Sequence, residues 1–276
     1  MSVVLAALDT TPAARLVLER AIQMGRLTGS RVEALHIRTG PMESLDTLEL
    51  LAARGNVPFR VLEGPVKRAL LSALSAPDVV AAVIGARSTT GGRRPVGRIA
   101  LAIIEHLDKP VLVVPPEVEA LGDFRCLLLP LEGTETSSRS VLEQLQPLLA
   151  EDAELVILHA FTDATVPAML DRPHRDLEIL GREFLTRHYP QASQIELRLG
   201  PVAPLVAEMS QAHGADLIVL SWSQDSSHGR ARVVREVLGA SALPVLLLPV
   251  KPLENEVAAM DSLPGGKILR GDNGKA

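Results

Sequence analysis

Aromatic side chains are nearly absent from this chain. They make up 2% of its 276 residues, with one Trp and one Tyr. Proteins that hold single-stranded nucleic acid stack the bases on aromatic side chains, and this chain has no set of them. The formal net charge is -5, and no long basic run is present. We therefore expect no nucleic acid partner.

Cysteine and long hydrophobic runs are also scarce. The single cysteine, Cys126, excludes an internal disulfide and a multi-thiolate metal site, and it suits a reducing compartment. Uncharged apolar runs such as residues 243–250 fall far short of the ~20 residues of a membrane helix. The first residues, MSVVLAALDTT, lack a basic region and reach Asp9 at once, so we expect no signal peptide. The sequence predicts a cytoplasmic protein without membrane contact.

The aliphatic residues that dominate the chain are arranged in two similar copies. Four blocks of the first half return in the same order in the second half: 35–36 as 158–159, 61–66 as 197–202, 80–85 as 216–221, and 110–115 as 244–249. The clearest of them reads VLEGPV and LRLGPV. Four matched blocks in one order indicate a duplication, and two copies make a domain pair, not a solenoid.

Composition places the domain boundaries. We predict one domain at 1–117 and a second at 123–250, each long enough to bury its own core. The remaining segment, 251–276, is polar and contains PGGKILRGDNGKA. We expect this tail to be disordered or loosely docked.

Each half alternates short apolar runs with segments of helical periodicity. This alternation predicts an α/β fold with a doubly wound, five-stranded parallel sheet in each half. In the second half, Pro147 predicts an early end or a kink in the first helix. Thr10, Thr11 and Pro12 are expected to cap and begin the first helix of the chain, and a second helix is expected over 43–54. The predicted strands are 3–8, 31–37, 57–62, 79–84, 111–114, 124–131, 154–160, 194–199, 217–220 and 245–248.

A candidate binding site follows from this topology. Open α/β sheets bind ligands beyond the carboxyl ends of their strands, where the strand order reverses. In the first half this edge should bring Asp9 to the Gly-rich segment 85–98, whose backbone N–H groups could face a phosphate. Asp9 reads equally well as a neighbour of a helix cap. The arginines at 87, 93, 94 and 98 either hold an anion or lie in solvent.

At these residues the chain resembles the universal stress protein family, and specifically its tandem members. The resemblance covers residues 1–250 and rests on ALDTT, LH, VLEGPV, IGARS and HLDKPVLVVP. It implies a Rossmann-like fold of the adenine nucleotide alpha hydrolase type. Nucleotide-binding members carry G-x2-G-x9-G-[ST] after the fourth strand and an acidic residue after the first. The resemblance implies that the glycines and the hydroxyl hold phosphates and that the acid lies beside the nucleoside.

The first half departs from this pattern only in part. Gly85 and Gly97 match the first and third glycines, Ser88 stands at the second, and Arg98 replaces the hydroxyl residue. Gly97 follows Gly85 by 12 positions, against 13 in the family pattern. Together with Asp9, these four residues are the candidate cofactor-binding residues, and ATP is a candidate ligand of the first half alone.

The second half departs much further. Ser221 and Gln224 replace the first two glycines, Ala231-Arg232 stand in place of Gly-Ser, and Glu132 replaces the acid. A side chain at a glycine position blocks close approach of the backbone to a phosphate. We therefore expect no ATP in this half.

Nothing in the sequence predicts catalysis or a metal site. It contains no G-x-x-x-x-G-K-[ST], no G-x-G-x-x-G and no G-x-S-x-G. His36 and His159 match between the halves and are interpreted as hydrogen-bonded residues at the edge of the core. We expect a non-catalytic, regulatory stress-response protein with degenerate ATP motifs. Two alternatives stay open: an ATP or anion sensor that uses the first half, with slow hydrolysis, and a structural protein-interaction module.

The last strand of each half predicts how the halves associate. Val111 to Val114 and Val245 to Leu248 are short apolar runs bracketed by prolines. The family resemblance implies a strand at the sheet edge that pairs with its counterpart, and an uncovered apolar edge is an association surface. We predict that the two halves pair through these strands. A homodimer of the whole chain and an unidentified protein partner stay open.

Overall fold

The first half of the chain forms five strands and four helices in strict alternation. The computed structural model describes residues 1–40, 43–87, 96–116, 122–131, 135–148, 153–161, 194–222 and 230–250. The elements of the first half are β1 (Val3–Ala7), α1 (Ala14–Thr28), β2 (Arg31–Arg38), α2 (Asp46–Arg54), β3 (Phe59–Glu63), α3 (Val66–Leu74), β4 (Val79–Gly85), α4 (Arg98–His106) and β5 (Val111–Val114).

The second half repeats this order. All ten predicted strands are confirmed, with ends within two residues of the prediction. The helix predicted within 162–193 and the tail 251–276 lie outside the described residues. The elements of the second half are β6 (Cys126–Leu131), α5 (Glu135–Leu145), β7 (Glu154–Phe161), β8 (Gln194–Leu199), α7 (Val202–Ala212), β9 (Leu217–Trp222), α8 (Arg230–Ala240) and β10 (Val245–Pro249).

Local contacts shift several helix ends. α5 ends at Leu145 ahead of Pro147 and continues as one 3-10 turn, so the proline prediction is confirmed. α1 begins at Ala14, later than predicted, because the Asp9 carboxylate accepts hydrogen bonds from the backbone N–H and hydroxyl of Thr11 and holds a turn there. α2 begins at Asp46 and not at Glu43, because the carboxylate of Glu43 accepts a hydrogen bond from the backbone N–H of Thr39.

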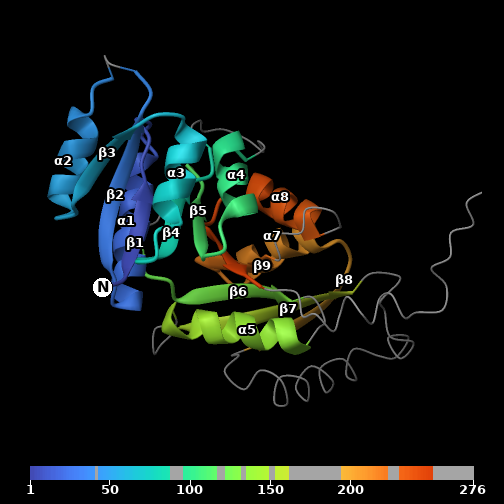
Figure 1. Cartoon of the computed structure of the whole chain (residues 1–276). Coiled ribbons are helices and arrows are strands. Elements are labelled where there is room, and N and C mark those ends of the chain that lie inside the picture. Colours follow the sequence, from blue (N-terminus) through green and yellow to red (C-terminus); the bar gives the residue numbers. More distant parts are fainter. Residues whose placement is uncertain are drawn as a thin grey trace, which may run out of the picture.

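The two parallel five-stranded units form one continuous sheet. Its order is β3-β2-β1-β4-β5-β10-β9-β6-β7-β8. Within each half the paired strands run parallel, whereas β5 and β10 pair antiparallel, with Val113 opposite Val245 and Val111 opposite Leu247. The two halves are thereby related by an approximate two-fold axis between these central strands (Figure 1).

A separate hydrophobic core covers each face of this sheet. One core includes residues of α3, α4, α7 and α8, and the other includes residues of α1, α2 and α5. Alternate residues of β5 enter opposite cores, Val111 and Val113 on one face, Leu112 and Val114 on the other, as alternation along a strand requires. Both cores therefore include residues of both halves.

Polar contacts also join the halves. The buried indole of Trp222 donates to the backbone carbonyl of Ile104 at 2.9 Å, from the end of β9 to the last turn of α4. The buried guanidinium of Arg20 in α1 donates to the carbonyl of Gly122 at 2.8 Å and lies 4.8 Å from the centre of the Phe124 ring.

No described helix is long and apolar enough to span a membrane.

Candidate functional site

A cavity of about 900 Å³ lies in the first half, at the carboxyl ends of β1, β2 and β4. It is the place where the strand order of that half reverses between β1 and β4. Four of the five predicted binding residues line it: Asp9, Gly85, Gly97 and Arg98. The fifth, Ser88, lies outside the described residues, as do Arg93 and Arg94.

Backbone hydrogen bonds shape the floor of the cavity. The N–H of Leu8 donates to the carbonyl of Leu35, and the N–H of Ala86 donates to the carbonyl of Val114, each at 2.8 Å. The N–H of Gly97 returns to the carbonyl of Ala86, also at 2.8 Å. The chain therefore comes back to the end of β4 before α4 begins, and the first turn of α4 lies beside the cavity.

Gly97 suits this close return. A Cβ at this position would lie 3.4 Å from the carbonyl oxygen of Ala86, at the lower limit of ordinary van der Waals contact. Gly97 also precedes α4 as its N-cap residue and carries no side chain to accept from the first turn. The positive end of the helix dipole at that turn therefore stays available to an anion.

The lining carries more positive than negative side chains. Lys67, Arg87 and Arg98 are cationic, whereas Asp9 and Glu43 are acidic. The remaining wall is largely apolar and includes Val17 and Leu70 together with Ile103. An apolar wall beside cationic side chains and a helix N-terminus suits a ligand with an apolar or planar part and an anionic group.

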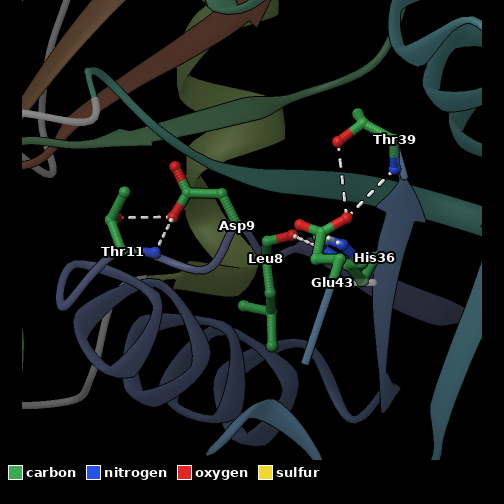
Figure 2. Close-up of polar contacts among 6 residues, drawn as sticks. All are labelled: Leu8, Asp9, Thr11, His36, Thr39 and Glu43. Carbon is green, nitrogen blue, oxygen red and sulfur yellow. Dashed lines mark hydrogen bonds and ion pairs between the residues drawn. The ribbon is translucent and has the colours of Figure 1, made fainter. Parts of the chain in front are cut away.

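A polar network closes one wall of the cavity (Figure 2). The Nδ1 of His36 lies 2.8 Å from the carbonyl oxygen of Leu8, and its Nε2 lies 3.3 Å from Oε1 of Glu43. The other carboxylate oxygen of Glu43 accepts from the backbone N–H of Thr39 at 3.0 Å and from its hydroxyl at 3.4 Å. The Thr39 hydrogen bond, with the neighbouring His36, holds the pKa of the Glu43 carboxyl below its ordinary value.

The matched histidine of the second half occupies the equivalent backbone position. His159 hydrogen-bonds to the backbone of Leu131, which corresponds in the repeat to Leu8. Burial lowers the pKa of His159, and this hydrogen bond opposes the shift. Both histidines therefore tie the end of the first strand of their half to the second strand.

At the end of the fourth strand the two halves differ. Ser221 and Trp222 of the second half correspond to Gly85 and Ala86, which line the cavity of the first. Trp222 is buried in the core that the halves share. The loops at 132–134 and 223–229, which correspond to the cavity loops of the first half, lie outside the described residues.

Sequence reasoning missed Lys67, Thr39 and Glu43 as lining residues. Lys67 follows the GPV motif and lies in the first turn of α3, but the second half has Ala203 at this position, so the repeat carried no signal for it. The sequence carried no signal for Thr39 and Glu43, because their positions at the cavity depend on the contact between Glu43 and His36. Among the described residues, no cluster of three or more His, Cys, Asp or Glu side chains could hold a metal.

The fold and the site define a class. Two parallel, doubly wound α/β units of equal topology pair through their last strands, and one unit carries a cavity at the β1/β4 switch point. The sequence model of the universal stress protein family matches residues 124–249. The second half is therefore a universal stress protein domain, and the first half has the same fold.

Solved structures share this fold over nearly the whole chain. A universal stress protein from Archaeoglobus fulgidus DSM 4304 is similar with a TM-score of 0.65 and 13% identity, over 90% of this chain and 98% of its own. A protein of unknown function from Pseudomonas aeruginosa PAO1 is similar with a TM-score of 0.68 and 15% identity, over 95% of this chain and 96% of its own. Among curated proteins, the sequence has no match.

Proposed function

We propose that this stress-response protein binds a nucleotide-class anion in the cavity of its first half and acts by binding, without turnover. The observation that carries the proposal is the meeting of Asp9, Gly85, Gly97 and Arg98 around one cavity. These residues come from segments more than 70 positions apart in the sequence. A helix N-terminus and cationic side chains at an apolar wall suit a phosphate attached to a planar base.

His36 is the reason to expect no turnover. Its Nδ1 faces the Leu8 carbonyl and its Nε2 faces the Glu43 carboxylate at 3.3 Å, so neither ring nitrogen is directed at a bound ligand. A general base must lie within hydrogen-bond reach of the proton that it removes. The degenerate motif in the loop after β4, with Arg98 in place of a hydroxyl residue, favours the same conclusion.

The test starts with the natively purified protein. Denaturing it should release an adenine nucleotide detectable by mass spectrometry, and ATP with Mg²⁺ should raise the Tm of ligand-free protein. Incubation with ATP should yield no ADP above a protein-free control. No released nucleotide, no thermal shift and no ATP affinity better than about 1 mM would favour the protein-interaction module instead.

A matched pair of variants locates the site. Arg98→Glu should weaken ATP binding at least about ten-fold, since it replaces an attractive charge at the cavity by a repulsive one. Arg232 corresponds to Arg98 in the repeat and is likewise exposed. Arg232→Glu should leave the affinity unchanged. Equal losses in both variants would place the ligand elsewhere.

A further inference from the structure

His36 lies between two hydrogen-bond acceptors. A carbonyl oxygen can only accept, so the Nδ1 that lies 2.8 Å from the Leu8 carbonyl oxygen carries a proton. A neutral imidazole has a single N–H. The Nε2 that faces the Glu43 carboxylate at 3.3 Å therefore attracts it only when His36 is an imidazolium (Figure 2).

We propose that His36 is a positioning residue of the cavity, which in its charged form holds Glu43 and Thr39 against the end of β1. Loss of its proton then loosens this wall, and ligand binding weakens as the pH rises. The inference rests on the proposed function for its ligand, because the wall matters for binding only if the cavity is the site. His36, Thr39 and Glu43 all line that cavity.

The surroundings leave the network few alternatives. The His36 side chain is 5% exposed, so water does not replace a lost partner. Glu43 is held from its other side by the N–H and the hydroxyl of Thr39, and its carboxylate cannot turn away from His36 without giving up these bonds. A neutral His36 thus presents a lone pair to a fixed carboxylate.

Other charged groups surround the same cavity but come from other elements. Asp9 follows β1, Lys67 belongs to α3, Arg87 follows β4 and Arg98 begins α4. α1 contributes only the apolar side chain of Val17 to the lining. In the part of the chain that the structure describes, Glu43 is the acidic side chain recorded against the ring of His36.

The sign of the pH effect follows from the charges of His36 and Glu43. The lowered pKa of Glu43 keeps its carboxylate charged throughout the range from about pH 6 to pH 8, so its own titration lies below that range. The variable in the contact is therefore the second proton of the imidazole. When His36 is charged, its contacts with the Leu8 carbonyl and the Glu43 carboxylate are both favourable. When His36 is neutral, only the contact with Leu8 remains favourable.

Glu43→Gln is the decisive variant. The carbonyl oxygen of the introduced amide can still accept from the Thr39 N–H, while its NH₂ group can donate to the lone pair of a neutral His36. The variant therefore keeps the wall closed when His36 is neutral and removes the advantage of the charged form. His159→Gln is the control, because it changes the matched histidine in the half without the proposed site.

The measurement is the Kd of ATP by calorimetry at about pH 6 and pH 8. The ratio of the Kd at the higher pH to that at the lower pH should be about five-fold larger for wild type than for Glu43→Gln, which corresponds to the loss of one charge-assisted contact. ATP itself titrates in this range, but its contribution cancels in the comparison of variants. His159→Gln should keep the wild-type ratio. Equal ratios for wild type and Glu43→Gln overturn the proposal.

A ligand-free readout separates the two proposals. The difference in Tm between wild type and Glu43→Gln should favour wild type more at pH 6 than at pH 8. A pH-independent difference overturns the positioning role of His36, whatever binds in the cavity. If ATP fails to bind at either pH while the Tm difference follows the expected sign, the proposed function fails and the role of His36 in holding the wall stands.

Discussion

At the scale of single residues, two glycines explain why the GPV motif occurs in both halves. Gly64 and Gly200, of VLEGPV and LRLGPV, have φ angles of +128° and +142°, a conformation that side chains with a Cβ rarely adopt. Each is followed by an extended proline that serves as the N-cap residue of α3 or α7. The motif recurs because both halves need the same sharp turn from strand to helix.

Substitution of either turn glycine should therefore be costly. Gly64→Ala and Gly200→Ala should each lower the free energy of unfolding by about 1–3 kcal/mol, the cost of a strained backbone. Gly122→Ala is the control, since Gly122 has no positive φ and a Cβ there would meet no atom within 4 Å. Urea unfolding measures all three. A control as destabilising as the turn variants would contradict the explanation.

At the scale of elements, the last turn of α4 depends on the other half. The final carbonyls of a helix lack intrahelical donors. One of them, that of Ile104, accepts from the indole of Trp222 at the end of β9. Nearby, Arg235 of α8 forms an exposed ion pair with Glu105 of α4 at 3.0 Å. The buried hydrogen bond should outweigh the exposed pair, because water competes for the latter.

Trp222→Phe tests this ranking. The change keeps an aromatic ring but removes the N–H, so the buried Ile104 carbonyl loses its donor, and the free energy of unfolding should fall by about 1–3 kcal/mol. Arg235→Gln should lower it by less than about 1 kcal/mol. Both are measured by urea unfolding followed by far-UV circular dichroism. A larger loss in Arg235→Gln would reverse the ranking.

At the scale of the whole molecule, the halves share both hydrophobic cores and one sheet. Neither half can unfold without exposing the apolar faces of β5 and β10. We therefore expect one cooperative transition. The only Trp of the chain, Trp222, is buried in the shared core and reports on that boundary. Its fluorescence and the far-UV circular dichroism should change at the same urea concentration. Two separated transitions, or two independently tumbling halves in scattering, would contradict this expectation.

Much of the fold could be predicted because its signals are local. A strand buried on both faces reads as a continuous apolar run, as β1, β5, β6 and β10 do, and all ten predicted strands formed. The starts of α1 and α2 were predicted too early, since they depend on where the carboxylates of Asp9 and Glu43 find their donors. Of the site, Asp9, Gly85, Gly97 and Arg98 could be found from the family motif and the topology.

The sequence by itself determined the duplicated α/β units, the turn glycines and the sheet edge at which a ligand would bind, because apolar periodicity and backbone restrictions act within a few residues. Only the tertiary structure decided that β5 and β10 pair antiparallel with Val113 opposite Val245, and that His36 lies between Leu8 and Glu43. These partners are set by packing between distant segments. The same local signals are compatible with several arrangements, and burial in a common core selects one.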